Sequence, residues 1–262
     1  MQPDKEKLAR IITELRDSEH ERYNIGTLRE KALHLVLKKY LEEDPAFHEI
    51  ETNGYVADIR KDGIIYEIET SGFSGLGPKL SAYLDDFRVY LVLPLARRKH
   101  LCWMDPGTGE LSKKHVSPKK ENEYDLLFEL VRILPYINHP NLHILGFMMD
   151  IEELRIADGW SRDGKKGSHR IEKIPLDIEY IAEFSTDDDY GKFIPGNCVT
   201  DFTVKDFCKG AKSLAPLSKK GLDTRTAYAV IRVLEARGLI SKTGKSGRSN
   251  TYSRTAGMTS AD

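Results

Sequence analysis

Hydrophobic residues near the start of the chain recur with the spacing of amphipathic helices. Over 4–18 the apolar positions follow an i, i+3, i+4, i+7 pattern, which predicts a helix with one buried face. These positions are Leu8, Ile11, Ile12 and Leu15. The segment GTLREKALHLVLKKYLEED predicts a second, largely buried helix. Thr27 is its candidate N-cap, and Glu30 three residues later completes a capping-box pattern.

The following segments alternate apolar and polar residues with the period of β-strands. Three strands are predicted, over 47–52, 55–60 and 64–70. A helix over 78–86 begins at Pro78, a residue favoured in the first turn. The run RVYLVLPL then favours a strand that is buried on both faces. This order predicts a right-handed βαβ unit over 64–94, so we expect an α/β domain with a mixed sheet.

The middle of the chain predicts further elements with less regular patterns. They are a strand over 98–104, a helix over 123–133 and an apolar strand in LHILGFMMDI. The Gly-rich, basic stretch 159–172 predicts a loop or hairpin. Residues 174–199 are ambiguous and are expected to hold a strand and a connector.

The C-terminal part predicts three helices followed by two strands. The helices are expected over 203–211, 214–221 and 223–238. Asp223 is the N-cap of the third helix, and Gly238 stands at its C′ position. The segment LISKTGKSGRSNTYSR then predicts a strand, a basic loop and a strand. The stripe that packs the third helix is Ala227, Val230, Ile231 and Leu234.

Charge is distributed unevenly along the chain. The 262 residues carry a net charge of −1, yet 201–254 hold twelve lysines and arginines against four acids. This segment therefore has a net charge of +8, and the remainder has −9. A basic module on an acidic body favours nucleic acid as the partner. An ordinary solvated surface is the alternative interpretation.

Composition excludes several classes of protein. The three cysteines form no C-x-x-C pair, which argues against a zinc ribbon or a disulfide framework. No apolar run is long enough for a transmembrane helix, and the N-terminus lacks an apolar signal core, so a cytoplasmic protein without membrane segments is expected. The histidines are scattered, and His34 is interpreted as a buried structural residue.

Three carboxylates are expected to meet on one surface of the predicted hairpin. Asp62-Gly63 is a two-residue type I′ turn signal, so Lys61 should pair with Ile64. Counting back, Asp58 lies opposite Glu67, and Glu69 follows on the same face. Two unit charges about 4 Å apart repel by roughly 4 kcal/mol at a dielectric constant of about 20. A hydrated Mg²⁺ ion would compensate this charge, whereas full exposure to water is the simpler alternative.

The order of these elements resembles the PD-(D/E)xK nuclease superfamily over about 26–105. That superfamily has an αβββαβ core of the restriction-endonuclease type. The matching positions are Glu30 in the first helix, Asp58 in the second strand, and Glu67-Ile68-Glu69 in the third. The resemblance implies that Asp58, Glu67 and Glu69 bind Mg²⁺ or Mn²⁺ and that Glu30 supports the site.

The sequence departs from that pattern at Glu69, where most members have lysine. The family lysine positions or activates the attacking water, and some members carry it on the following helix instead. Lys79 stands at the start of the predicted helix 78–86, from which it could reach Glu69. The resemblance therefore implies that Lys79 replaces the missing lysine. A plain surface lysine is the alternative.

The basic C-terminal part resembles a winged helix-turn-helix domain over about 200–255. In that fold the third helix enters the major groove of DNA, and the β-wing contacts phosphates. The resemblance implies DNA contacts from the third helix by Thr224, Arg225, Thr226, Tyr228 and Arg232. It implies phosphate contacts from the wing by Lys242, Lys245, Arg248 and Asn250. A winged helix used for protein contact is the alternative.

Together these features predict a metal-dependent DNA endonuclease with a separate DNA-docking domain. The alternative is a non-catalytic, regulatory DNA-binding protein with a degenerate nuclease fold, which Glu69 in the lysine position motivates. A homodimer is compatible with cleavage of both strands, although the sequence shows no dimerisation surface. The expected units are an N-terminal helix 1–25, a nuclease-like domain 26–155, a connector 156–199, a winged helix-turn-helix domain 200–256 and a tail 257–262.

Overall fold

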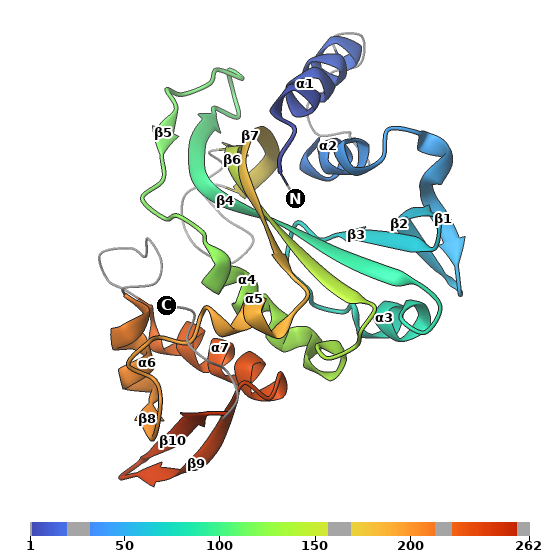
Figure 1. Cartoon of the computed structure of the whole chain (residues 1–262). Coiled ribbons are helices and arrows are strands. Elements are labelled where there is room, and N and C mark those ends of the chain that lie inside the picture. Colours follow the sequence, from blue (N-terminus) through green and yellow to red (C-terminus); the bar gives the residue numbers. More distant parts are fainter. Residues whose placement is uncertain (1, 20–31, 157–168, 213–221, 256–262) are drawn as a thin grey trace.

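The computed structural model describes residues 2–19, 32–156, 169–212 and 222–255. Its centre is a large mixed sheet with helices on both faces, followed by a smaller C-terminal unit (Figure 1). The sheet order is β1-β2-β3-β4-β6-β7, with β5 paired to β4. The strands are β1 His48–Thr52, β2 Tyr55–Lys61, β3 Ile64–Ile68, β4 Arg88–Met104, β5 His115–Val116, β6 Leu142–Ile156 and β7 His169–Phe184. The chain is therefore an α/β protein with a mixed sheet, as its sequence predicts.

The hairpin between β2 and β3 has the predicted register. Asp62 and Gly63 have φ angles of +50° and +77°, the left-handed conformation that a type I′ turn requires. Lys61 pairs with Ile64, and the ladder continues to Ile59 and Tyr66. The short turn thus sets which residues of β2 and β3 face each other.

A βαβ crossover follows the hairpin. α3 (Gly77–Tyr83) connects β3 to β4, and the two strands pair in parallel as expected. β4 is one strand of 17 residues, not the two separate strands predicted over 88–95 and 98–104. A register shift between Ala96 and Arg98 lets the strand bend and continue along β6.

The predicted connector 156–199 contributes a full strand to the large sheet. β7 pairs antiparallel with β6. The first pair is Ile144 with Phe184, and the last is Ile156 with His169. Residues 169–184 therefore belong to the sheet of the main body, and α5 (Asp187–Gly191) leads away from it. The predicted loop over 159–172 lies mostly outside the described residues.

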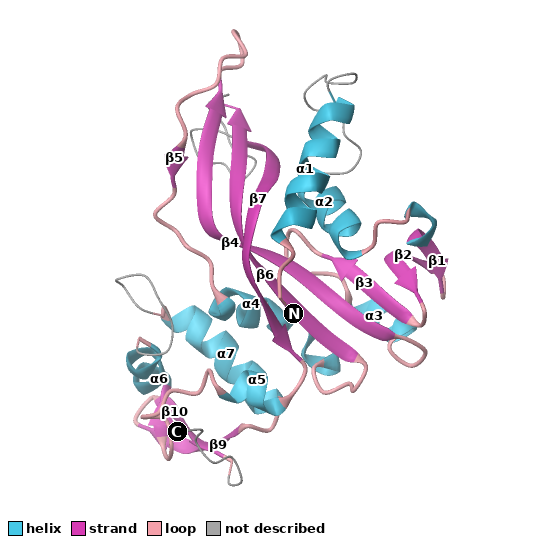
Figure 2. Ribbon diagram, turned by 45° about the horizontal axis from the view of Figure 1, so that its top comes forward, coloured by secondary structure: helices cyan, strands magenta, loops and turns pink. Residues whose placement is uncertain are grey.

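Helices cover the two faces of the sheet separately (Figure 2). α1 (Lys5–Glu19) and α2 (Ala32–Leu41) pack on one face, where Leu8 and Leu37 join a core with Phe147 of β6. On the other face lie α3, α4 (Glu123–Leu130) and the 3₁₀ helix Val131–Tyr136. α1 therefore shares the core of the body and is not a separate unit. The predicted N-cap Thr27 lies outside the described residues.

The C-terminal unit consists of two helices and a small antiparallel sheet. The helices are α6 (Val204–Ala211) and α7 (Thr224–Ala236), and the sheet order is β8-β10-β9. Its strands are β8 Phe202–Thr203, β9 Ile240–Ser246 and β10 Ser249–Arg254. Asp223 caps α7 by accepting a hydrogen bond from the Thr226 amide, and Gly238 ends it with φ +72°, as predicted. The predicted helix 214–221 lies outside the described residues.

The described helices offer no membrane-spanning segment, because none combines the necessary length with apolar character.

Candidate functional site

The side chains of Asp58, Glu67 and Glu69 lie close together just beyond the point where the pairing of β2 and β3 ends. Asp58 lies one step beyond the last β2–β3 pair, Ile59 with Tyr66. Its carboxylate accepts a hydrogen bond from the Ile68 amide at 2.7 Å. Glu67 lies on β3, and the backbone of Glu69 donates to the Val92 carbonyl of β4 at 2.8 Å. The hairpin register and the parallel β3–β4 pairing thus bring the three acids together.

Glu67 is the most unusual of these acids because it is 1% exposed. Its Oε2 atom accepts a hydrogen bond from Lys79 Nζ at 2.6 Å. Its Oε1 atom is buried without a hydrogen-bond partner among the described residues. Burial and then the charge of Asp58 raise the pKa of Glu67 to about 7, although Lys79 opposes the shift. The carboxylate therefore lacks full compensation.

Glu69 extends the same cluster of negative charge. Burial and the nearby Asp58 raise its pKa, while Lys79 and His34 act in the opposite direction. The sequence suggested that Lys79 would reach Glu69, but the structure places its ammonium group on Glu67. The first turn of α3 points the lysine at the strand residue, because Glu67 faces the α3 side of β3.

His34 joins the site, although the sequence favoured a structural role for it over a role near Glu30. It lies on α2, and its Nε2 atom is 3.2 Å from Asp58 Oδ2. Both side chains are about one-fifth exposed. The packing of α2 against the sheet creates this contact, and no local spacing indicates it. Glu30, the helix residue that the sequence favoured, lies outside the described residues.

Tyr83 of α3 is fully buried near the acids. Its hydroxyl group is buried without a hydrogen-bond partner among the described residues. Burial first, and then Glu67 and Asp58, raise the pKa of Tyr83. The Tyr55 ring packs edge-on against it with 6.3 Å between centroids. The tyrosine keeps its proton in this environment and is a potential hydrogen-bond donor toward the cluster.

The site fits a hydrated divalent cation better than a fully protein-bound one. Among the described residues, no three His, Cys, Asp or Glu side chains are arranged to hold a metal ion. The predicted ligands Asp58, Glu67 and Glu69 lie near one another without forming such a group in the described structure. However, Mg²⁺ commonly uses one or two carboxylates and retains several waters. The unpartnered oxygen of Glu67 and the excess of acids over Lys79 match that chemistry.

The predicted DNA-contact residues of α7 do not all face the same way. Arg225, Tyr228 and Arg232 form an exposed stripe, with Tyr228 43% exposed. Thr224 is exposed, whereas the Thr226 hydroxyl donates to Asp223 at 2.7 Å. The Arg225 guanidinium lies over the Phe128 ring of α4 at 5.0 Å. Arg225 therefore contacts the body of the protein.

The basic residues of the last hairpin remain open to solvent. Lys242 and Lys245 on β9 and Arg248 in the turn are exposed, and Asn250 on β10 is partly exposed. This hairpin and the stripe on α7 belong to one unit, because Ile240 of β9 and Val230 of α7 share a buried cluster.

Comparisons with other proteins place these features in a family. The sequence profile of a domain of unknown function, DUF8091, matches residues 31–185. An uncharacterized protein of Treponema pallidum is 25% identical over 229 residues, covering 87% of this chain and 86% of its own. No solved structure matches the chain significantly. The matched region begins at α2 and ends after β7, so it contains every described residue of the acidic site.

Proposed function

The chain belongs to the family defined by the domain of unknown function DUF8091, and we propose that it is a metal-dependent endonuclease acting on DNA. The observation that carries this proposal is Glu67, whose buried Oε1 atom has no partner beside Asp58 while Lys79 holds Oε2. Perturbed, desolvated acids of this kind concentrate at functional sites. The order of α2, β1 to β3, α3 and β4 supports a PD-(D/E)xK-like core around them.

In this proposal each side chain has a defined role. Asp58 and Glu67 would hold Mg²⁺ or Mn²⁺, which when bound lowers the pKa of a coordinated water and offsets charge on a phosphate. His34 and the Ile68 amide fix the Asp58 carboxylate, and Lys79 fixes that of Glu67. Glu69 is close enough to interact with Asp58 and is suited to orienting a water molecule.

The C-terminal unit is proposed to dock DNA as a winged helix-turn-helix domain. Its support is the exposed stripe on α7, the exposed lysines and arginine of the last hairpin, and the net charge of +8 over 201–254. Phosphate contacts of this kind position a protein on the duplex, and they weaken as salt rises.

Plasmid nicking with Mg²⁺ or Mn²⁺ tests the nuclease proposal. Asp58→Asn removes the carboxylate charge that would hold the metal together with Glu67. We expect this change to lower the cleavage rate at least 100-fold. Asp62→Asn is the matched control, since asparagine tolerates the left-handed turn, and it should cleave like the wild type. Undiminished cleavage by purified Asp58→Asn protein would refute the assignment.

A second candidate function is DNA binding without catalysis. It is favoured by the absence of a three-ligand metal set among the described residues and by Glu69 in place of the usual lysine. Titration calorimetry with Mn²⁺ separates the two candidates. Heat of binding that disappears in Asp58→Asn and Glu67→Gln proteins supports the nuclease, whereas the absence of such binding with intact DNA affinity supports the regulatory protein.

A further inference from the structure

A groove of about 550 Å³ runs between the body and the C-terminal unit. Its lining comes from the loop after β3, the middle of β4, the segment before α4 with Lys119 and Glu121, α4 itself, β7 and the first turn of α7. The residues that matter below are Thr70, Phe128, Arg170, Lys173 and Arg225. This volume lies within the range of pockets that hold drug-sized ligands. The groove is therefore too small to hold a DNA duplex.

The groove begins directly beside the acidic site. The Glu69 amide bonds the Val92 carbonyl, and the groove lining starts at the next residue of each segment, Thr70 and Leu93. Gly72 holds the loop in place because its φ of +98° and its lack of a side chain let it lie against Glu129 of α4. If a strand of DNA lay across the acids, the nucleotide next to the one at the acids would therefore enter the groove.

The acids of the groove are already engaged within the protein. Glu121 accepts from the Ala96 amide at 2.8 Å, and Glu129 pairs with Arg132 at 3.2 Å. Asp125 accepts from the Asn122 amide at 2.9 Å in the capping box of α4. Asp223 caps α7. These carboxylates have structural partners within the protein, although they keep their charges and Glu121 still acts on Lys173.

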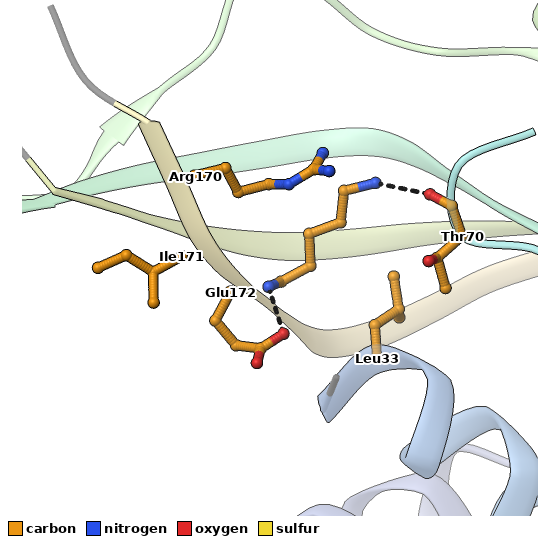
Figure 3. A pocket seen from close by; sticks show the side chains of 6 residues that line it. Leu33, Thr70, Arg170, Ile171 and Glu172 are labelled. Carbon is orange, nitrogen blue, oxygen red and sulfur yellow. Dashed lines mark hydrogen bonds between the residues drawn. The ribbon is translucent and has the colours of Figure 1, made fainter. Parts of the chain in front are cut away.

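The cations are less completely compensated. The Arg170 side chain makes no hydrogen bond or ion pair with the described residues, although its charge acts on Glu153, and it extends from β7 toward Thr70 (Figure 3). Lys173 Nζ donates to the Thr70 carbonyl at 3.2 Å. Burial, followed by the charges of Arg170 and Lys99, lowers the pKa of Lys173 to about 8, although Glu121 and Glu153 oppose the shift. An anion at this position would relieve the repulsion.

The opposite wall offers a flat, aromatic surface. The guanidinium of Arg225 lies over the Phe128 ring at 5.0 Å, and both line the groove. Bases stack on aromatic rings and on guanidinium planes without requiring a particular sequence. Phosphate-binding cations on one side and a stacking surface on the other match the two parts of a nucleotide.

We propose that this groove binds a single-stranded segment of DNA, with its phosphates at Arg170 and Lys173 and a base against Phe128 and Arg225. The inference rests on the proposed function, since it extends that site to the neighbouring nucleotides. It assigns the substrate class: DNA with a single-stranded portion, such as an overhang or a fork. The duplex portion lies outside the groove, against the last hairpin.

Binding measured in EDTA tests the inference without any cleavage. The probes are a fluorescent oligothymidylate of about twelve nucleotides, within the usual range of single-strand site sizes, and a hairpin duplex. In Arg170→Ala/Lys173→Ala protein we expect oligothymidylate binding to weaken at least tenfold at moderate salt. The slope of log affinity against log salt should fall by about 1.4, because each lost contact contributes about 0.7. Phe128→Leu, which keeps the bulk, should weaken it about fivefold or more.

Matched controls separate the groove from general charge. Lys5→Ala/Arg88→Ala removes two exposed cations elsewhere and should leave oligothymidylate binding unchanged. Lys245→Glu/Arg248→Glu should weaken binding of the hairpin duplex more than that of the oligothymidylate. Equal loss of both probes in Arg170→Ala/Lys173→Ala protein overturns the inference, as does unchanged oligothymidylate binding by Phe128→Leu.

Two further outcomes are informative. Thymidine monophosphate and unlabelled oligothymidylate are each used to displace the labelled oligonucleotide. If both do so at the same concentration, the groove is a site for free nucleotides and the strand proposal fails. Groove-dependent binding of oligothymidylate by a protein that never cleaves DNA supports this inference and refutes the nuclease. If the groove variants still cleave DNA and bind oligothymidylate as tightly as the wild type, the nuclease proposal is supported and this inference is refuted.

Discussion

At the scale of single residues, the protonation of Glu67 links the candidate site to stability. The ordinary pKa of this carboxyl is 4.5, and burial raises it to about 7 in the folded protein. The folded state therefore binds the proton more tightly than the unfolded chain does. Without metal, the free energy of unfolding should fall as pH rises from about 4.5 to 7, and it should stay lower above that window.

Glu67→Gln removes this cost because the amide stays neutral. We expect the variant to be more stable than the wild type by about 2–3 kcal/mol at pH 8 in EDTA, since one pKa unit is worth about 1.36 kcal/mol. The difference should vanish near pH 4, and cleavage should be lost. Urea unfolding across this pH range measures it, with Glu51→Gln, an exposed glutamate on β1, as the control. A wild type that is more stable at pH 8 would contradict the raised pKa.

Sequence patterns identified part of this site and missed part of it. Asp58 and Glu67 could be placed opposite each other because the Asp62-Gly63 turn fixes the strand register locally. His34 could not, because its contact with Asp58 depends on how α2 packs on the sheet, 24 residues away in the chain. The same limit explains why the partner of Lys79 was predicted as Glu69.

At the scale of elements, α6 depends on a close approach that only glycine allows. A Cβ atom on Gly210 would collide with Asn197 and would lie 2.5 Å from the Pro195 Cβ. Asn197 also donates to the Asp206 carbonyl of α6 at 3.1 Å. The loop before β8 therefore lies directly on the helix.

Gly210→Ala should destabilise the protein by about 1–3 kcal/mol, the usual cost of overpacking. Alanine is intrinsically about 1 kcal/mol better than glycine in a helix, so a net loss shows that the rigid proline ring cannot move aside. Gly196→Ala is the control, because nothing lies within 4 Å of its Cβ position. Denaturant unfolding measures both, and equal stability of the two variants would mean that the loop shifts easily.

Most elements were predictable because their patterns are local, and the failures have a common cause. The sequence predicts separate strands over 88–95 and 98–104, at a point where the charged residues Arg97 to Lys99 interrupt the apolar run, yet both are parts of β4. Those charges are accommodated by ion pairs with neighbouring strands, such as Arg98 with Asp150 at 3.1 Å. β7 was predicted only as an unplaced strand within 174–199, since charges such as those of Asp177 and Glu179 pair with Lys5 and Arg97, which are distant in sequence.

At the scale of the whole molecule, the C-terminal unit and the body share one core. Phe207 of α6 and Val230 of α7 belong to the same buried cluster as Leu126 of α4 and Phe184 of β7. The boundary near residue 200, expected from the change in charge, does not separate two cores. Charge reports what a surface can bind, and it says little about which residues are buried together.

Polar contacts reinforce this junction. Arg237 donates to the Ile137 carbonyl at 2.9 Å, forms an ion pair with Asp187 and lies over the Tyr190 ring at 4.8 Å. Asn138 donates to the Ala236 carbonyl at 2.7 Å. The groove between the two units therefore has a fixed geometry.

We consequently expect residues 200–256 not to fold as an isolated fragment, although a winged-helix domain of that size commonly could. Removal of the body would expose its share of the common core, and domains this small are only marginally stable. Thermal melting followed by circular dichroism should show no cooperative transition for the fragment. The full chain should melt once, with the same midpoint by circular dichroism and by fluorescence of Trp103 and Trp160, which both lie outside that unit.

A pair of full-length variants tests the same coupling without truncation. Arg237→Ala breaks the contacts to Ile137 and Asp187, whereas Arg232→Ala removes an exposed arginine from the same helix. Arg237→Ala should lower the melting midpoint by several degrees, and by the same amount in circular dichroism and in fluorescence. The reason is that loss of a buried charged hydrogen bond costs about 1.5–3 kcal/mol. The second should leave the midpoint unchanged. A cooperative melt of the fragment, or separate transitions in Arg237→Ala protein, would show that the C-terminal unit is an independent domain and that the groove can open.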